Sequence, residues 1–329
     1  MAPSAVTPPA VEAKTVQTFG NNEPHSPVPT ANIGTTRKIV CFSDFDGTIF
    51  MQDTGHILFN NFGCGSEKRE ILDKQINSGE RTFRDVSEEM WGSLDVPFDD
   101  GFEVMKGALE IDRDFQTFHT FCLNNNIPFN VISAGLKPVL KRVLDHFLGE
   151  EAASNIDIVA NDATISADGS SWKPVWRHEG DLGHDKALSI QTIREGEKLK
   201  SEDGTIPMIV FIGDGVSDLP AAREADVLFA RRGLRLEEYC VEHSIKYTPF
   251  DTFADIQREL IKLAKIDEEK TKGEGLPAAF NPRANMWRRA SSTASVPLFA
   301  QMTPRDEKMF VWPEHFSEYK PSVPLSVAE

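Results

Sequence analysis

The stretch KIVCFSDFDGT (residues 38–48) is an apolar run followed by two aspartates, Asp44 and Asp46, with one residue between them. A short and nearly continuous apolar run is typical of a strand covered on both faces, as in a parallel sheet. Further runs of this kind are PFNVIS (128–133), PMIVFIGD (207–214) and DVLFA (226–230). Their recurrence predicts several buried parallel strands.

Helical patterns lie between these runs. Residues 138–148 place their apolar side chains on one face, and Gly149 suits the end of a helix. Residues 252–266 form a second pattern, in which Thr252 and Asp255 resemble a capping box. Strands that alternate with helices predict a doubly wound, Rossmann-like α/β fold.

Proline content and helical spacing predict the domain organisation. Residues 1–36 and 268–329 are rich in proline and small polar residues, and we expect both to be disordered arms. Residues 51–120 have helical spacing and many charges, which favours a small helical domain inserted after the first strand. The α/β core then comprises residues 37–50 and 121–267.

Length and charge exclude several classes of protein. The 329 residues suffice for a large core, and the net charge of −16 argues against a broad nucleic-acid surface or an anionic-membrane anchor. No apolar run approaches the roughly 18 residues of a membrane span. The start lacks a secretory pattern, and the four cysteines form no CxxC. We therefore expect a cytoplasmic protein, with the nucleus as an alternative.

Polar residues follow the predicted strands. They are Asp44, Asp46 and Thr48 after the first run, Ser133 and Gly135 after the second, Asp214 and Asp218 after the third, and Lys186 before a helical pattern. Ligands of open parallel sheets bind outside the carboxyl ends of the strands, so we expect these residues to converge. Clustered carboxylates repel one another unless a cation joins them. Oxygen ligands favour Mg²⁺ with a substrate phosphate.

The residue types at this edge predict a reaction. A carboxylate can attack phosphorus, and a second carboxyl two residues along can protonate the leaving oxygen and later activate water. Lys186 supplies a fixed positive charge for the same anion. The interpretation is metal-assisted phosphoryl transfer through an aspartyl intermediate.

The motifs DFDGT, SAG, a lysine before a helix, and GDGVSD occur in this order within residues 38–266. The chain thereby resembles the haloacid dehalogenase (HAD) superfamily, in its phosphoserine-phosphatase-like branch. The resemblance implies a HAD-like fold with a helical cap over the site. It also implies that Asp44 is the nucleophile and Asp46 the general acid and base.

The resemblance implies further roles. Asp44, Asp214 and the backbone carbonyl of Asp46 would hold Mg²⁺. Ser133 and Lys186 would hold the transferring phosphoryl group. The remaining implied residues are Gly135 for substrate binding, with Asp218 and Thr48 in support.

The substrate depends on the cap. The acidic cap residue of phosphoserine phosphatases maps onto Asp53, but their substrate-gripping arginine falls on Met90, which cannot pair with a carboxylate. Arg81 or Arg84 could take its place under another register. The wider sequence resembles fungal polyol phosphatases, which favours a polyol or sugar phosphate, with Asp53 and His56 as candidates to bind its hydroxyls.

Alternatives remain at this point: a phosphoserine phosphatase, or a catalytically silent phosphate-binding regulator. Several residues also have ordinary structural interpretations. Asp53 suits a helix cap, Met90 suits the core of the cap, and His184 suits a supporting role. Ser291 follows two arginines and resembles a kinase site, which would make a kinase a partner.

Overall fold

The computed structural model describes residues 37–200 and 207–272. The predicted N-terminal arm, Ser291 and most of the predicted C-terminal arm lie outside these residues. The last helix, α11 (Phe253–Thr271), extends four residues into the range predicted for the C-terminal arm.

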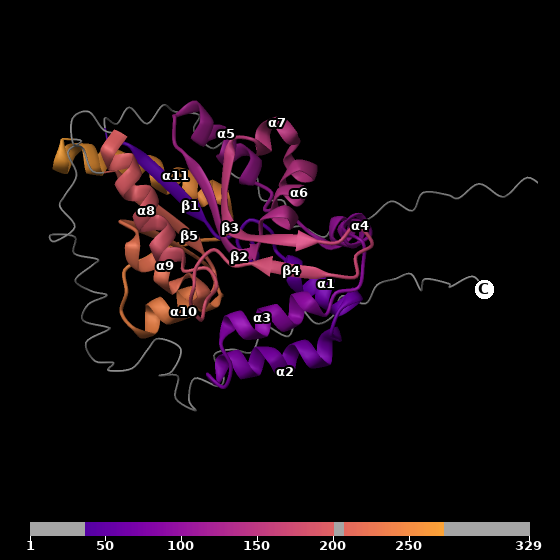
Figure 1. The fold of residues 1–329 in the computed structure, drawn as a ribbon. Helices are drawn as coiled ribbons and strands as arrows, with labels where there is room; N and C mark the ends of the chain where they lie inside the picture. The colour runs from indigo at the N-terminus through magenta and orange to yellow at the C-terminus, as the bar shows by residue number, and fades with distance from the viewer. Residues whose placement is uncertain (1–36, 201–206, 273–329) are drawn as a thin grey trace, which may run out of the picture.

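A seven-stranded sheet with strand order β4-β3-β2-β1-β5-β6-β7 forms the centre of the fold (Figure 1). Its strands are β1 (Ile39–Ser43), β2 (Phe129–Leu136), β3 (Ile156–Ile165), β4 (Trp172–Val175), β5 (Met208–Gly213), β6 (Val227–Arg231) and β7 (Thr248–Phe250). All neighbours are parallel except β3 and β4, which pair antiparallel. The four predicted strands are β1, β2, β5 and β6, and the predicted doubly wound fold is confirmed.

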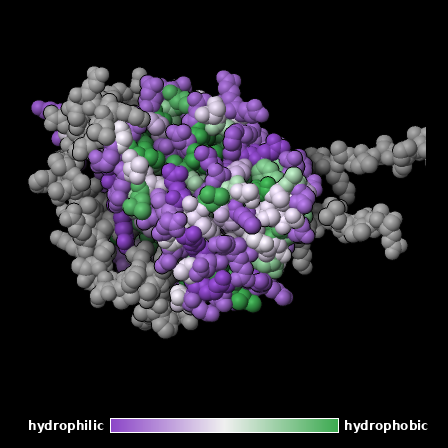
Figure 2. Space-filling view, in the orientation of Figure 1, coloured by the Kyte–Doolittle hydropathy of each residue, from purple (hydrophilic) through white to green (hydrophobic). Residues whose placement is uncertain are grey.

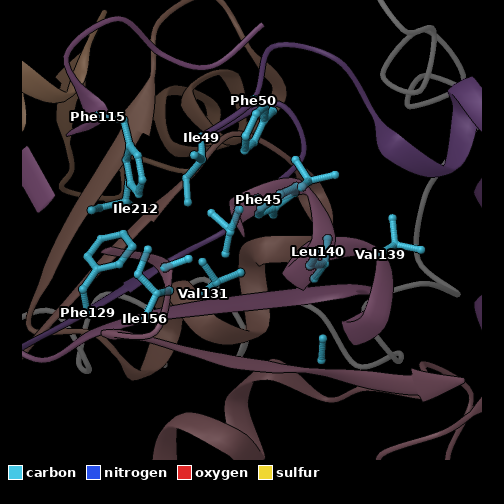
Figure 3. Packing of buried hydrophobic residues seen from close by; sticks show 14 of the residues in the cluster. Phe45, Ile49, Phe50, Phe115, Phe129, Val131, Val139, Leu140, Ile156 and Ile212 are labelled. Atoms are coloured by element: carbon cyan, nitrogen blue, oxygen red, sulfur yellow. The ribbon is translucent and has the colours of Figure 1, made fainter. Parts of the chain in front are cut away.

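Helices cover both faces of the sheet. The helices of the core are α5 (Phe115–Asn124), α6 (Lys137–Leu148), α7 (Glu150–Ala153), α8 (Lys186–Lys200), α9 (Leu219–Glu224), α10 (Arg235–Glu242) and α11, with a 3-10 turn η1 (Val216–Asp218). In β1, Ile39 and Cys41 join the apolar cluster that includes α5, α6 and α11. Figure 3 shows part of this cluster, with Phe115 of α5 and Leu140 of α6. Val40 and Phe42 join the cluster that includes α9 and α10. Alternate residues thus fill two cores, which explains the continuous apolar run.

Four helices lie between β1 and α5. They are α1 (Thr54–Phe62), α2 (Gly65–Asn77), α3 (Phe83–Gly92) and α4 (Phe98–Ala108), and we call residues 54–108 the helical insertion. It is fastened to the β3–β4 hairpin, because Trp172 Nε1 donates to Val96 O at 2.9 Å and Trp91 stacks on Trp172 at 6.3 Å. The predicted range 51–120 also holds the first half of α5, which packs on α11 through Phe115 and Phe253 at 4.9 Å.

The described surface is mixed in character. On the face seen in Figure 2, hydrophilic side chains surround scattered hydrophobic ones. The exposed large hydrophobic residues lie on six different elements: Ile71, Leu123, Val175, Leu188, Val241 and Ile266. None of the described helices combines the length and apolar character that crossing a bilayer requires.

Candidate active site

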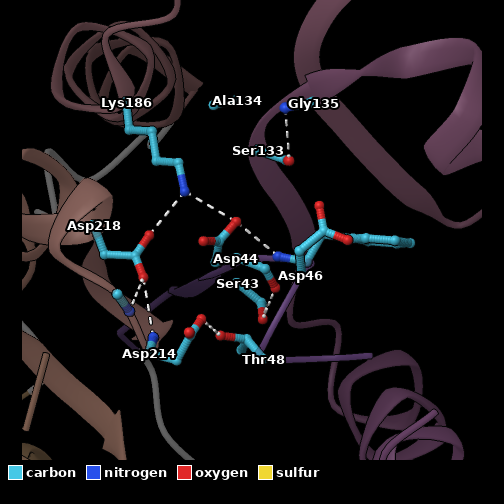
Figure 4. A network of polar contacts seen from close by, with 12 residues as sticks. Ser43, Asp44, Asp46, Thr48, Ser133, Ala134, Gly135, Lys186, Asp214 and Asp218 are labelled. Carbon is cyan, nitrogen blue, oxygen red and sulfur yellow. Dashed lines mark hydrogen bonds and ion pairs between the residues drawn. The ribbon is translucent and has the colours of Figure 1, made fainter. Parts of the chain in front are cut away.

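The predicted site residues meet at the carboxyl ends of β1, β2 and β5 (Figure 4). Asp44 directly follows β1, Asp214 directly follows β5, and Ser133 lies within β2. Lys186 is the first residue of α8 and reaches the same edge. Because β1 lies between β2 and β5 in the sheet, the topology alone brings these strand ends together.

Lys186 is buried and ties two carboxylates together. Its Nζ lies 2.9 Å from Asp44 Oδ1 and 2.8 Å from Asp218 Oδ1. Burial alone would lower the pKa of Lys186, but Asp218 and Asp44 outweigh it and raise that pKa. The lysine is therefore a permanent positive charge, and its side chain is only 3% exposed.

Asp214 is held from several sides. Thr48 Oγ1 donates to Asp214 Oδ1 at 2.7 Å, and the backbone N–H groups of Asp214 and Gly215 donate to Asp218 Oδ2 at 3.0 and 3.1 Å. Gly47 has φ +77°, and a Cβ there would lie 2.3 Å from Asp214 Oδ2. Glycine is thus required both by the turn and by the close approach of the carboxylate.

Three buried carboxylates form an oxygen-lined cluster that fits a cation. Oxygens of Asp44, Asp214 and Asp218 all lie within 4.8 Å of one another. Burial, followed by the charge of Asp218, raises the pKa of Asp44 well above its usual range and that of Asp214 to about 7. One lysine therefore does not balance three carboxylates. A buried set of oxygen ligands has the chemistry that Mg²⁺ prefers.

Asp46 is held by the first turn of α1. Its Oδ1 accepts the Thr54 N–H at 2.9 Å, and its Oδ2 accepts from Thr54 Oγ1 at 3.2 Å. Burial and then the charge of Asp53 raise the pKa of Asp46 well above its usual value. Asp53 itself caps α1 by accepting the His56 N–H at 2.7 Å. The ordinary interpretation of Asp53 as a helix cap is therefore confirmed, and its role in substrate binding stays a prediction.

Ser133 and Gly135 form a tight loop at the end of β2. The Gly135 N–H donates to Ser133 Oγ at 3.0 Å. A Cβ on Gly135 would lie 3.3 Å from Ser133 Oγ and 4.0 Å from Asp46 Oδ2. The structure thus brings Ser133, Gly135 and Asp46 to one place.

The arginines considered for the insertion already have carboxylate partners. Arg81 Nη1 lies 2.6 Å from Glu89 Oε2, and Arg84 Nη1 lies 3.2 Å from Glu179 Oε2. Met90 is 4% exposed and belongs to the apolar core, as its ordinary interpretation predicted. At the first residue of α3, Phe83, the structure has a pocket. It is lined by Phe83, Ala134, Leu182, His184, Lys186, Ser217 and Pro220.

Three residues of the site were not found from the sequence. Thr54 orients Asp46, and Asn161 donates to Ala134 O at 2.8 Å. Arg231 donates to Thr48 O at 2.6 Å and pairs with Asp112 at 2.9 Å. Only Arg231 had a signal, because it is a charged residue directly after an apolar run. Thr54 and Asn161 belong to no motif, and their positions depend on tertiary packing.

Comparison with known proteins agrees with this geometry. A family model described as haloacid dehalogenase-like hydrolase matches residues 41–223. Pdp3-interacting factor 1 of Schizosaccharomyces pombe is 38% identical over 69% of this chain and 96% of that protein. Polyol phosphate phosphatase PYP1 of Saccharomyces cerevisiae is 34% identical over 72% of this chain and 98% of that protein.

A solved structure has a similar fold. The phospho-aspartyl intermediate analogue of a phosphoserine phosphatase superposes with a TM-score of 0.51 at 18% identity. The match covers 69% of this chain and 99% of that one. At this identity the likeness concerns the fold alone.

Proposed function

This chain belongs to the haloacid dehalogenase-like hydrolase family, and we propose that it is a magnesium-dependent phosphatase acting on a small polyol or sugar phosphate. The observation that carries the proposal is the bridge from Lys186 to Asp44 and Asp218 beside Asp214. Asp44, the proposed nucleophile, thereby lies beside a buried lysine and a carboxylate cluster at one edge of the sheet. That combination suits a transferring phosphoryl group.

Asp44 is the proposed nucleophile. One of its oxygens attacks phosphorus, and the bond between phosphorus and the ester oxygen breaks as the new bond forms. Lys186 and Ser133 hold the phosphoryl oxygens during this transfer. The product is a phosphoryl group on Asp44 and a free alcohol.

Asp46 is the proposed general acid and base. Its raised pKa favours the protonated form, which can give its proton to the leaving alkoxide. The resulting carboxylate then takes a proton from water, which attacks phosphorus and breaks the bond to Asp44. Inorganic phosphate leaves, and Asp46 is again protonated.

The carboxylate cluster is the proposed magnesium site. Asp44, Asp214 and the backbone carbonyl of Asp46 would hold the ion, while Asp218 and Thr48 orient Lys186 and Asp214. When bound, Mg²⁺ would neutralise charge on the phosphoryl oxygens. It would also lower the raised pKa values of Asp44 and Asp214, because a nearby cation favours carboxylates.

The contacts of the helical insertion favour a substrate whose alcohol part carries no charge. Arg81 and Arg84 are engaged by Glu89 and Glu179, so neither is preset to grip a substrate carboxylate. The relative PYP1 is by its name a polyol phosphate phosphatase. Asp53 and His56, at the start of α1, remain the candidates to bind substrate hydroxyls, and Asp53 influences Asp46 through its charge.

A phosphate-release assay tests the proposal. Glycerol, sorbitol and sugar phosphates are compared with phosphoserine, each with and without Mg²⁺. We expect Mg²⁺-dependent release, fastest from a polyol or sugar phosphate, and none from Asp44→Asn. Preference for phosphoserine would identify the alternative substrate. Binding of beryllofluoride without any turnover would identify a silent regulator and overturn the proposal.

A further inference from the structure

His184 is a buried group that the proposed reaction does not use. It is 3% exposed and lies in the loop before α8, two residues before Lys186. Its Nδ1 lies 2.7 Å from Ser133 O, and its Nε2 lies 2.9 Å from Ser189 Oγ. Burial lowers the pKa of His184 to about 3, so the ring is neutral at physiological pH.

The partners of a neutral ring determine where its one proton lies. The Ser133 carbonyl can only accept, so Nδ1 carries the hydrogen and donates it. Nε2 then accepts from the Ser189 hydroxyl, whose oxygen in turn accepts from Arg177 Nε at 3.2 Å. The hydrogen bonds run in one direction from Arg177 to Ser133.

Asn161 holds the next backbone carbonyl in a similar way to His184. This residue of β3 is fully buried, and its Nδ2 donates to Ala134 O at 2.8 Å. Its Oδ1 accepts a hydrogen bond from the backbone N–H of Arg177 at 3.0 Å. Two successive carbonyls, of Ser133 and Ala134, are therefore held by side chains that converge on Arg177.

The strand pairing explains why these carbonyls need side-chain partners. The β2–β3 register shifts between Ile132, opposite Val159, and Leu136, opposite Asn161. Four residues of β2 thus correspond to two of β3, and residues 133–135 bulge out of the ladder. Bulges of this kind occur near active sites, where they redirect a side chain. This bulge directs Ser133 and Gly135 to the site edge.

We propose that His184 and Asn161 are positioning residues, which hold the bulge at residues 133–135 in the shape that receives the phosphoryl group. The role of the bulge rests on the proposed function. Because His184 and Lys186 belong to one short segment, the hydrogen bond from His184 to Ser133 O also fixes the lysine relative to the bulge. A neutral ring achieves this without placing a second positive charge beside Lys186.

The test compares His184→Leu, His184→Asn and the control His119→Leu in the full-length protein with Mg²⁺. Leucine removes both ring nitrogens, whereas the asparagine amide can still donate to Ser133 O. His119 is also buried, but it lies in α5 and its Nε2 has no hydrogen-bond partner within residues 37–200 and 207–272. Its replacement therefore controls for loss of a buried imidazole.

The measurements are kcat, its pH profile, and the Kd of inorganic phosphate by calorimetry. For His184→Leu we expect kcat to fall and Kd to rise, each at least about tenfold, because small displacements in a site cost rate and affinity. His184→Asn should recover both to within about threefold, and His119→Leu should change neither. The pH profile should keep its shape, because a neutral positioning group does not titrate in this range.

Each outcome decides the proposal. Unchanged kcat and Kd in folded His184→Leu overturn it, as does a shifted pH profile or a failure of asparagine to rescue. Weakened phosphate binding in a protein without turnover supports it while refuting the proposed function. Wild-type protein that neither binds phosphate nor releases it from any of the esters refutes both. If His184→Leu does not fold, Asn161→Asp, which loses the donor to Ala134 O, should weaken phosphate binding about tenfold, and an unchanged Kd overturns the proposal.

Discussion

The edge of the sheet and the helical insertion differ in how far their paired charged side chains are exposed. At the edge, Lys186 and Asp218 are 3% and 0% exposed and bind each other within a buried cluster. In the insertion, Lys68 and Arg81 share Glu89 at the surface, with side chains 53%, 31% and 33% exposed. Pairs of the second kind contribute little to stability. We infer that the residues at the edge of the sheet serve the reaction itself, whereas the surface residues of the insertion can differ with the substrate.

Lysine replacements test this contrast most severely. Lys186→Met should lower kcat/KM at least about 10³-fold, because it removes the cation aimed at the phosphoryl group. Lys68→Met, a lysine-to-methionine change in the insertion, should alter it less than about twofold. Steady-state assays on a polyol phosphate measure both. A loss below tenfold in Lys186→Met would contradict the assigned role.

The insertion should depend on its apolar contacts instead. Trp91 is 5% exposed and packs on Phe59 at 4.8 Å and Trp172 at 6.3 Å. Trp91→Ala should reduce the free energy of unfolding by about 3–5 kcal/mol in a urea titration. The exposed Ile71→Ala is the control and should stay within about 0.5 kcal/mol. Equal effects of the two variants would show that apolar packing does not hold the insertion in place.

The carboxylate cluster should make stability depend on pH and Mg²⁺. The folded pKa of Asp214 is raised to about 7, so the folded state binds more protons than the unfolded state above the ordinary value of 3.8. Without metal, stability should therefore fall as pH rises from about 4 to 7, by at least about 3 °C in Tm. Thermal unfolding at several pH values measures this.

Added Mg²⁺ is the second half of the same experiment. It should raise Tm more at pH 8 than at pH 5, because it binds the ionised cluster. Asp214→Asn should lose most of that increase. An Mg²⁺ effect that is equal at both pH values, or is intact in Asp214→Asn, would speak against the assigned metal site.

Arg84 should give the smallest effect. Its partner Glu179 is 94% exposed, and its guanidinium lies 5.7 Å from the ring centre of Trp176. For Arg84→Gln we expect an unchanged kcat and a KM within about twofold on a polyol phosphate. Loss of a phosphoserine phosphatase activity in this variant would instead show that Arg84 leaves Glu179 to bind substrate.

The sequence predicted the edge better than the insertion for a physical reason. The apolar runs and the residues after them are local signals, and parallel topology brings their ends together. That was enough to place Asp44, Ser133 and Asp214 at one edge, whereas Lys186 was expected there from its position before a helical pattern and from the order of the motifs. The short strands β4 and β7 lacked such runs, and the apolar run of β3 is interrupted by polar residues, because the second half of this strand is partly exposed.

Contacts between distant segments could not be read in advance. Asn161 serves the site only because β2 bulges opposite it, which no local pattern encodes. The pairing of Arg84 with Glu179 joins residues 95 positions apart. Residues that could select the substrate are positioned by such contacts, whereas the residues after the apolar runs are positioned by the sheet itself.

In the proposed reaction Asp44 carries the phosphoryl group during turnover. Asp46→Asn should slow the second step, so acid quenching of this variant during turnover followed by peptide mass spectrometry should capture the intermediate. We predict a phosphoryl group on the peptide that contains Asp44, and none when Asp44→Asn is added. A phosphoryl group on another residue, or unlabelled protein during continued phosphate release, would show that Asp44 is not the nucleophile.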